Sequence, residues 1–243
     1  MGKKIDISVL IPCYDEAPYI MDAVQSVVKQ TFSNWELVIV NDGSTDGTAV
    51  ILERVLQRYR RYPVSVVATD HQGCAGATKT AIAFSVAPLC TILDGDDLFT
   101  EKSLEVVVKA FRQNRDIDYM WSKYIARADG TSKWKPGRSK ALPPGKTLKE
   151  ALLSGWWGAL AQRSFRRSAY ALTKGLDARL PYAVDQQLSM LFANANCKAQ
   201  HLPIVTYQHL QHKKQMSAVH YRDQQRCRGE ILKQLGGSYV KER

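Results

Sequence analysis

The chain has 243 residues, of which 45% are hydrophobic and 23% are charged, so it has material for a core and is not wholly disordered. No apolar run approaches the roughly 20 residues that cross a bilayer, which is evidence against a membrane-spanning segment. The net charge is +11, but residues 1–100 hold 8 Lys and Arg against 12 Asp and Glu, and residues 101–243 hold 26 against 11. The acidic first half suits a divalent cation, and the basic second half suits an anionic partner.

The chain contains five widely spaced cysteines, Cys13, Cys74, Cys90, Cys197 and Cys227. No two of them form a Cys-x-x-Cys pair, which is evidence against a disulfide framework or a structural zinc site and favours a reducing compartment. The apolar run near the N-terminus is short and soon meets Pro12, so it is typical of a buried strand rather than a signal peptide. We therefore expect a cytoplasmic location, with or without peripheral contact with the inner face of a membrane.

The first hundred residues alternate between strand-like and helix-like segments. The apolar runs of strand length are Ile5–Ile11, Trp35–Val40, Val64–Ala68 and Leu89–Leu93. Apolar residues recur at helical spacing in Ala17–Gln30, Val50–Leu56, Cys74–Val86 and Glu101–Asn114. Strands that are apolar throughout and separated by helices indicate a parallel sheet covered on both faces, so the fold class is α/β. In such sheets, ligands bind beyond the carboxyl ends of the strands.

After residue 115 the pattern changes. Tyr119–Ala126 is typical of a strand, and a hairpin turn at Ala128–Gly130 and a basic loop at Lys133–Lys149 follow it. The segments with helical spacing are Leu148–Leu153, Ser164–Leu172, Asp185–Ala195 and Arg222–Leu235. No internal repeat or Gly/Ser linker separates the two halves, so we expect one continuous body.

The sharpest chemical signal is the acidic segment Asp94-Gly95-Asp96-Asp97, which follows the fourth predicted strand. Three carboxylates in four residues repel one another unless a cation lies among them, and Mg²⁺ and Mn²⁺ prefer oxygen ligands. A solvated acidic turn at the start of a helix would explain the same residues. Further polar segments follow the first two strands, at Pro12–Glu16 and Asn41–Asp46, and predict a polar site along this edge of the sheet.

Four segments together, IPCYDEAPYI, QTFSNWELVIVNDGSTDGT, GCAGATKTAI and CTILDGDDLF, resemble the inverting family 2 glycosyltransferases in order and spacing. The resemblance covers about residues 5–112 and implies a GT-A fold, a mostly parallel Rossmann-like sheet flanked by helices with a mixed acceptor-side extension. It implies a nucleotide-sugar-binding part at residues 1–115 and, continuous with it, an acceptor-binding part at residues 116–243. Such enzymes transfer a sugar from a nucleoside diphosphate donor to an acceptor hydroxyl with inversion, here in bacterial surface-glycan synthesis.

The resemblance also implies roles for individual residues. Asp94 and Asp96 form its DxD motif, which together with His212 would bind Mn²⁺ or Mg²⁺. The implied donor-binding residues are Pro12, Tyr14, Glu16, Asp42, Lys79 and Asp94. A second segment, RSFRRSAYALTKGLDARLPYAVDQQLSMLFA, is similar to the family's acceptor side and makes Asp185 the catalytic base. Because a helix N-terminus stabilises a carboxylate, we expect the pKa of Asp185 to be lowered and its side chain to be ionised at pH 7.

Four positions depart from the family's pattern. Asp15 replaces a usual Asn, and Val184 stands before the predicted base where Glu is commoner. Thr78-Lys79 stands where Arg-Asn is common, so one phosphate contact of that Arg is missing unless Lys79 replaces it. These departures keep open a second interpretation, a non-catalytic GT-A-like domain that only binds nucleotides.

The basic loop contains no acidic residue between positions 130 and 149, and its cations are Lys133, Lys135, Arg138, Lys140, Lys146 and Lys149. We assign it to the acceptor side, where an anionic glycan, a lipid-linked diphosphate or an anionic membrane surface would suit it. A solvated loop is the alternative. No recognised nucleic-acid-binding motif is present, and no Gly-rich basic loop of the kind a nucleotidyltransferase requires follows the first strand. The donor sugar and the oligomeric state stay open.

Overall fold

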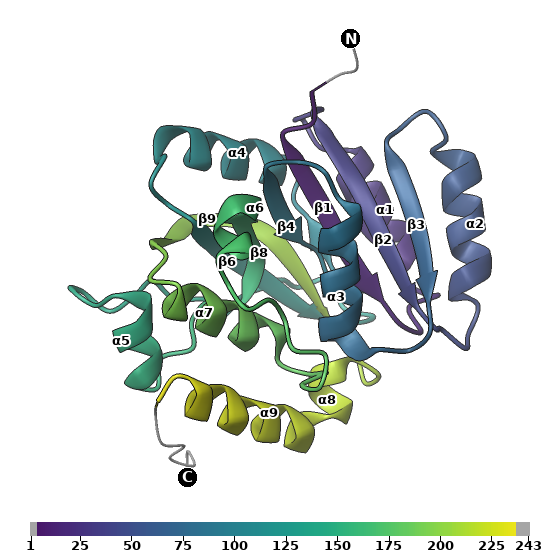
Figure 1. Cartoon of the computed structure of the whole chain (residues 1–243). Coiled ribbons are helices and arrows are strands. Elements are labelled where there is room, and N and C mark those ends of the chain that lie inside the picture. Colours follow the sequence, from purple (N-terminus) through teal and green to yellow (C-terminus); the bar gives the residue numbers. More distant parts are fainter. Residues whose placement is uncertain (1–3, 237–243) are drawn as a thin grey trace.

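The computed structural model describes residues 4–236, in which helices cover both faces of one nine-stranded sheet (Figure 1). The strands are β1 (Ile7–Cys13), β2 (Trp35–Asp42), β3 (Val64–Thr69), β4 (Leu89–Ile92), β5 (Leu98–Phe99), β6 (Tyr119–Ala128), β7 (Lys135–Pro136), β8 (Ala161–Arg166) and β9 (Ala199–Gln211). The helices are α1 (Ile20–Val28), α2 (Thr48–Arg58), α3 (Gly73–Phe84), α4 (Ser103–Gln113), α5 (Leu148–Leu153), α6 (Arg167–Ala171), α7 (Val184–Asn194), α8 (Met216–Val219) and α9 (Tyr221–Gln234). Residues 1–3 and 237–243, the ends of the two predicted parts, lie outside this description.

The strands follow the spatial order β3-β2-β1-β4-β8-β6-β9-β5, and β7 pairs with the outer part of β6. The four strands β3, β2, β1 and β4 are parallel. β8 is antiparallel to both of its neighbours, β9 is parallel to β6, and β5 is antiparallel to β9. The predicted fold class, a mostly parallel α/β sheet with a mixed extension, is therefore confirmed.

The parallel strands are held in place from both faces. Every residue of β1 is buried, and its side chains alternate between two apolar clusters. Ile7, Val9 and Ile11 pack in the cluster that includes α1, α2 and α4, whereas Leu10 packs in the cluster that includes α3 and α7. The carboxyl ends of the strands are thus fixed, and the polar residues that follow them have defined positions at one edge of the sheet.

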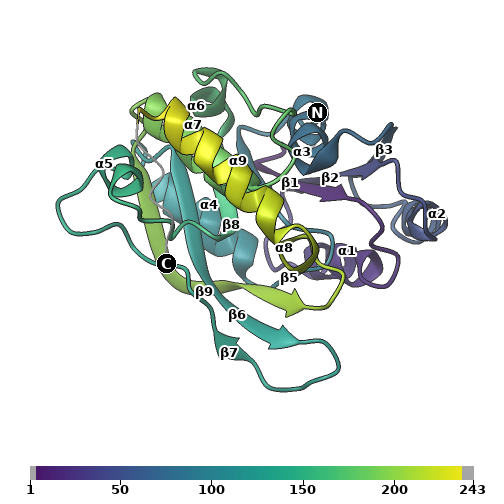
Figure 2. The ribbon, with the colours of Figure 1, turned by 90° about the horizontal axis from the view of Figure 1, so that it is seen from below.

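The acceptor side is built on α7, which packs against the mixed part of the sheet. Leu188, Leu191 and Phe192 are buried as the sequence predicts, and the ring of Phe192 stacks on Tyr119 of β6 at a centroid distance of 4.8 Å. Beyond α7 lies α9 (Figure 2), which adds Ile231 to the same core. The apolar face of α7 therefore fixes the position of its first turn, which carries Asp185.

In this half one sequence-based prediction is wrong and one strand was not predicted. The segment Ser164–Leu172 was expected to be one helix, but its first residues belong to β8 and only Arg167–Ala171 is helical. The long strand β9 was not predicted, because its sequence mixes His and Gln with apolar residues and contains Pro203. Pro203 lies where the pairing of β9 with β6 shifts register, and a proline that donates no N–H is tolerated at such an irregularity.

Candidate active site

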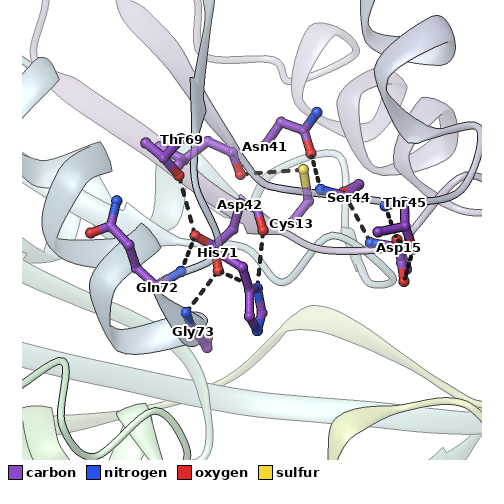
Figure 3. A network of polar contacts seen from close by, with 12 residues as sticks. Cys13, Asp15, Asn41, Asp42, Ser44, Thr45, Thr69, His71, Gln72 and Gly73 are labelled. Carbon is purple, nitrogen blue, oxygen red and sulfur yellow. Dashed lines mark hydrogen bonds and ion pairs between the residues drawn. The ribbon is translucent and has the colours of Figure 1, made fainter.

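The ends of β1, β2 and β3 are joined by a hydrogen-bond network centred on Asp42 (Figure 3). Asp42 is 1% exposed, and its carboxylate accepts the backbone N–H groups of Gln72 and Gly73 at 2.9 and 2.8 Å. Thr69 Oγ1 donates to the same carboxylate at 3.2 Å, and His71 Nδ1 lies 3.1 Å from it. The predicted donor residue Asp42 therefore holds the start of α3, whose free N–H groups favour a negative charge.

The second part of this network is the loop after β1. Asp15 adopts a left-handed backbone conformation with a φ of 54°, which Asn and Asp tolerate better than most residues. Its Oδ1 accepts the N–H groups of Thr45 and Asp46 at 2.7 and 3.2 Å, and its own N–H donates to Ser44 Oγ at 3.0 Å. We call these residues, together with those around Asp42, the Asp42 network.

Tyr14 lies beside the Asp42 network and is 41% exposed. Its ring is 4.2 Å from the ring of His71, centroid to centroid, with the two planes inclined by 41°. An exposed aromatic ring at the end of a parallel strand offers a stacking surface for a planar group. The structure thus places Tyr14 near Asp42, and both are predicted donor-binding residues.

A second group of polar side chains, which we call the carboxylate cluster, consists of Glu16, Asp94, Asp96, Arg163 and His212. One ligand atom from each of Glu16, Asp96 and His212 lies within 4.8 Å of the other two. His212 Nε2 is 2.9 Å from Asp96 Oδ2, and both side chains are largely buried, with exposed fractions of 6% and 13%. Tyr19 stacks on the His212 ring at 4.4 Å. The structure therefore brings together Asp96 and His212, two of the predicted metal ligands.

Glu16 shows that these groups fit a cation. Its Oε2 is buried and has no hydrogen-bond partner among residues 4–236. Burial, and then the charges of Asp96 and Asp97, raise the pKa of Glu16 to about 9. A buried carboxyl crowded by other carboxylates and facing an imidazole nitrogen is a donor set of the kind that Mn²⁺ or Mg²⁺ accepts. Glu16, predicted as a donor-binding residue, thus lies with Asp96 and His212 in a group that could hold a metal ion.

Asp94, by contrast, is hydrogen-bonded to Arg163 and Tyr207. Both of its oxygens accept hydrogen bonds from Arg163 Nη2, at 2.8 and 2.9 Å, and its Oδ2 also accepts one from Tyr207 Oη at 3.0 Å. The Arg163 side chain is only 8% exposed, and its Nε has no partner in the described part of the chain. The structure thus separates the two aspartates of the predicted DxD motif, with Asp94 held by an arginine and Asp96 beside His212.

Asp97, the third acid of the segment, is buried and hydrogen-bonded to β9. It is 2% exposed, and its carboxylate accepts the N–H of Leu210 at 2.8 Å and contacts His209 Nδ1 at 3.1 Å. Burial opposes the charged form of His209, but the hydrogen bond and charge of Asp97 outweigh it and raise the pKa of His209 to about 8. This pair fastens the acidic segment to β9.

Asp185 lies half-buried in the first turn of α7, and the charges of Arg163 and Asp94 act on it. The expected lowering of its pKa is wrong. Burial raises the pKa of Asp185 and outweighs the opposing effects of the Arg163 charge and of the Gln186 N–H. The N-terminus of a helix stabilises a carboxylate only modestly. The loss of water around the half-buried Asp185 therefore decides the direction in which its pKa shifts.

The α3 start and the loop before α7 are in direct contact. Gly73 has a φ of +76°, and a Cβ built on it would lie 2.5 Å from Pro181 Cβ. Ala183, which precedes α7, also has a positive φ of 61°. A glycine is required at position 73 both by its backbone conformation and by this close approach. The donor side and the acceptor side are therefore packed tightly where Asp42 and Asp185 lie.

The remaining predicted donor residues lie farther from this group. Pro12 is buried within β1, in register with Val40 of β2. Lys79 is exposed on α3, beyond its first turn, and its charge adds weakly to the effect of Arg179 in holding the pKa of Asp177 below its usual value. No hydrogen bond or ion pair within residues 4–236 joins Lys79 to the carboxylate cluster. The cation nearest to the acidic segment is instead Arg163.

The sequence reasoning missed Arg163, Tyr207 and His209. Tyr207 and His209 belong to the unpredicted strand β9, and Arg163 belongs to β8, which was expected to be part of a helix or of the loop before it. The one available signal was that Arg163 begins the acceptor-side segment RSFRRSAYAL, which the family resemblance had already marked.

Comparison with known proteins decides the family. Residues 8–171 match the family model described as glycosyl transferase family 2. The chain belongs to glycosyl transferase family 2. A structure of Staphylococcus aureus TarS in complex with UDP-GlcNAc superposes on 98% of this chain and 68% of its own, with a TM-score of 0.72 at 20% identity. This similarity shows that the family 2 chain has the GT-A fold that its motifs predict.

Two curated relatives each match about half of this chain. The glycosyltransferase GlyG of Streptococcus pneumoniae is 31% identical over 49% of this chain and 38% of its own length. The Escherichia coli protein WfgD, named a UDP-Glc:alpha-D-GlcNAc-diphosphoundecaprenol beta-1,3-glucosyltransferase, is 29% identical over 49% of this chain and 45% of its own length. The matched region spans less than half the length of these two relatives. Within residues 4–236, no helix combines the length and the apolar character needed to cross a bilayer.

Proposed function

We propose that this chain is a metal-dependent inverting glycosyltransferase that transfers a hexosyl or N-acetylhexosaminyl group from a nucleoside diphosphate donor to an acceptor hydroxyl. The observation that carries the proposal is the meeting of Glu16, Asp96 and His212 at the strand ends. Asp185 lies in the first turn of α7, where the charges of Arg163 and Asp94 act on it. Family membership and the UDP-GlcNAc complex of TarS support a UDP-sugar as the donor.

The donor would lie across the ends of β1, β2 and β4. Tyr14 offers a stacking surface for the base, beside Asp42, whose carboxylate binds the N–H groups at the start of α3. Glu16, Asp96 and His212 would hold Mn²⁺ or Mg²⁺, which would neutralise the charge that develops on the diphosphate leaving group. We assign donor binding to residues 1–115 and acceptor binding to residues 116–243.

Asp185 would accept the proton of the attacking acceptor hydroxyl. A general base works best when its pKa approaches the operating pH, so the raised pKa of Asp185 favours this role more than a lowered one would. A single base opposite the leaving group gives one displacement, and one displacement inverts the anomeric carbon. Such assistance typically contributes about 10²–10⁴-fold to the rate.

The acceptor is proposed to be anionic, either a glycan or a lipid-linked diphosphate. The supporting observation is the exposed basic loop, in which Lys133, Lys135 and Lys140 are solvent-exposed beside the β6–β7 hairpin that extends from the body (Figure 2). WfgD, whose name includes a diphosphoundecaprenol-linked acceptor, supports a role in bacterial surface-glycan synthesis. This acceptor would place the chain in the cytoplasm, in peripheral contact with the inner membrane face.

Donor hydrolysis tests the proposed activity. The full chain is incubated with a panel of nucleotide sugars and Mn²⁺, and the release of nucleoside diphosphate is measured with and without EDTA. We expect at least one UDP-sugar to be hydrolysed with Mn²⁺ and none with EDTA. Binding of UDP without release from any donor would instead support a non-catalytic nucleotide-binding domain. Release of pyrophosphate from a nucleoside triphosphate would indicate a nucleotidyltransferase.

Vesicle flotation tests the membrane contact separately. Binding to vesicles that contain an anionic phospholipid should exceed binding to neutral vesicles and weaken steeply with salt, because the Debye length falls from about 10 Å at 0.1 M to about 3 Å at 1 M. Equal binding to neutral and anionic vesicles would remove the membrane from the proposal. A soluble phosphate-bearing acceptor would then replace it.

A further inference from the structure

The segment between β9 and α9, which contains α8, is anchored at both of its ends (Figure 2). At its start, His212 Nε2 contacts Asp96 Oδ2 at 2.9 Å. At its end, His220 Nδ1 contacts Tyr182 Oη at 3.1 Å, and the two rings stack at a centroid distance of 4.7 Å. Tyr182 lies shortly before Asp185 in the chain. The segment therefore runs from the carboxylate cluster to the loop that precedes α7.

Between these two anchors, the segment exposes apolar side chains. Met216, Val219 and Tyr221 are exposed by 36%, 58% and 62%. The backbone that carries them is ordered, since the N–H of Val219 donates to the carbonyl of Gln215 at 3.1 Å and that of His220 donates to the carbonyl of Met216 at 2.9 Å. Single exposed apolar residues are ordinary on a protein surface, but neighbouring ones on one short helix and the start of the next form a patch.

Exposed cations flank this patch on both sides. Lys213 and Lys214 precede α8, and Arg222 lies in the first turn of α9. No acidic residue occurs between Lys213 and Arg222, and the next acid, Asp223, is paired with Arg226 at 3.4 Å. We call the three cations and the three apolar residues the α8 surface: Lys213, Lys214, Met216, Val219, Tyr221 and Arg222.

Two other exposed regions each have half of this combination. The basic loop is rich in exposed cations, but none of its large apolar side chains is exposed. Phe84 and Val86 are exposed by 60% and 72%, but no Lys or Arg occurs in the chain between Lys79 and Lys102. The α8 surface combines exposed apolar side chains with exposed cations.

We propose that the α8 surface docks this chain on an anionic lipid bilayer. Apolar and aromatic side chains that enter the interface, flanked by Lys and Arg that contact the headgroups, are the usual chemistry of such a contact. A second copy of the chain fits less well. In a twofold contact the surface would face itself, and the three cations of one copy would lie against those of the other.

The place of the α8 surface gives the docking a consequence, which rests on the proposed function because it concerns a lipid-linked acceptor. The two anchors join the surface to Asp96 on the donor side and to Tyr182 on the acceptor side. Docking there brings the headgroups of the bilayer beside the carboxylate cluster and the loop before α7. A lipid-linked diphosphate thus reaches the site from the bilayer, and the basic loop contacts the acceptor rather than the membrane.

Vesicle flotation of the full chain tests the charges of the α8 surface. The vesicles contain phosphatidylcholine alone or phosphatidylcholine with phosphatidylglycerol. The charge variant replaces the three cations: Lys213→Gln, Lys214→Gln and Arg222→Gln. Its affinity for the anionic vesicles should fall at least about tenfold at about 0.1 M salt, because each basic residue at an anionic surface contributes about fivefold, and its salt dependence should become shallower.

The matched control removes the same charge from the basic loop, by three exposed substitutions: Lys133→Gln, Lys135→Gln and Lys140→Gln. Because the net charge of the chain is then the same as in the charge variant, the comparison separates a local contact from a general attraction. We expect the control to lose less than about threefold in vesicle affinity, well below the loss that three cations at the bilayer surface would give.

The apolar variant tests the other half of the α8 surface: Met216→Ser, Val219→Ser and Tyr221→Ser. Its vesicle affinity should fall at least about tenfold at low and at high salt alike, because salt does not screen the burial of apolar side chains. The control replaces three apolar residues that are at least as exposed elsewhere: Phe84→Ser, Val86→Ser and Leu172→Ser. It should bind vesicles as the wild type does. Urea unfolding of each variant verifies that these exposed substitutions leave the fold intact.

Three outcomes would overturn the proposal. They are the absence of wild-type binding to anionic vesicles, wild-type binding by the apolar variant, and an equal loss in the charge variant and the basic-loop control. A wild-type dimer that the apolar variant converts to a monomer in sedimentation, with vesicle binding unchanged, would assign the surface to a second copy instead. None of these measurements requires turnover. If no donor is hydrolysed, the proposed function fails, and flotation still decides whether the α8 surface docks on the bilayer.

Discussion

The Asp42 network and the carboxylate cluster lie side by side at one edge of the sheet, but their polar groups are satisfied to different degrees. In the Asp42 network, the oxygens of Asp15 and Asp42 accept protein N–H and O–H groups. In the carboxylate cluster, Glu16 Oε2, His212 Nδ1 and Arg163 Nε have no partners within residues 4–236. The polar groups of the Asp42 network are hydrogen-bonded without a ligand. Those of the carboxylate cluster would gain partners and opposite charge from a bound ligand.

This difference indicates which carboxylates stabilise the fold and which bind a ligand or take part in the reaction. A carboxylate that accepts several N–H groups rigidifies the loops around it, and its replacement should change stability more than chemistry. A carboxyl held near other acids at a raised pKa, as Glu16 is, should affect ligand binding more than folding. The following variants test this division, and Asp185 serves as the reference for a direct chemical role.

Asp185→Asn should have the largest effect. Asparagine keeps the size of the side chain but has no basic oxygen, so transfer or donor hydrolysis should fall by at least about 100-fold. UDP affinity, measured by calorimetry, should change little because the proposed donor contacts lie on the other half of the chain. Asp177→Asn is the control, since Asp177 is paired with the exposed Arg179. Equal losses in both variants would show that Asp185 is only the start of a helix.

Asp96→Asn should have the next largest effect, on metal affinity. The variant keeps the shape of the cluster and removes one charge beside His212 and Glu16, so the affinity for Mn²⁺ alone should fall at least about tenfold. Calorimetry with Mn²⁺ in the absence of donor measures it directly. Asp94→Asn is the informative comparison, because Asp94 is bound by Arg163 and should affect Mn²⁺ affinity less. A larger loss of Mn²⁺ affinity in Asp94→Asn than in Asp96→Asn would indicate that Asp94 is a metal ligand.

The same two groups of residues show what the sequence could predict. The strands β1 and β2 are almost entirely apolar and buried because both faces of the sheet are covered there. Their positions, and the polar residues after them, could therefore be predicted from the apolar runs of the sequence. Asp96 and His212 are 116 positions apart, and only the family's pattern of motifs indicated that they could meet. Their contact at 2.9 Å depends on β9, which the sequence did not predict.

The mixed half was harder to predict for physical reasons. β8 has neighbours on both edges and is buried, yet its sequence AQRSFR contains Gln, Arg and Ser, so neither alternation nor an apolar run marks it. The bulge at Gln162 has no glycine to indicate a positive φ. The direction of the Asp185 pKa shift depends on how much water the folded chain removes, which a helix position does not indicate. The strand β8, its bulge and the pKa shift of Asp185 each depend on tertiary contacts, which the local sequence does not show.

Asp42→Asn should mainly affect stability. The amide keeps one acceptor oxygen, so the N–H group of Gln72 or of Gly73 loses its partner and faces the buried NH₂ group of the new side chain instead. The free energy of unfolding in urea should fall by about 1–3 kcal/mol, the typical cost of an unsatisfied buried donor. Asp70→Asn, at an exposed neighbouring position, should change it by less than about 0.5 kcal/mol. Wild-type stability in Asp42→Asn would contradict the division between the two groups of residues.

Asp15→Asn should have the smallest effect, although Asp15 is an acid close to the same site. Asparagine also tolerates the positive φ of 54°, and its carbonyl oxygen can accept the N–H groups of Thr45 and Asp46 as Asp15 Oδ1 does. Only the charge and the long contact from Thr45 Oγ1 to Oδ2, at 3.3 Å, are lost. We expect the free energy of unfolding to change by less than about 1 kcal/mol, whereas Asp15→Ala, which has no side-chain acceptor, should lose more. If the asparagine and alanine variants were equally destabilised, the charge of Asp15 rather than its oxygen would be what the loop requires, and the Asp42 network would resemble the carboxylate cluster after all.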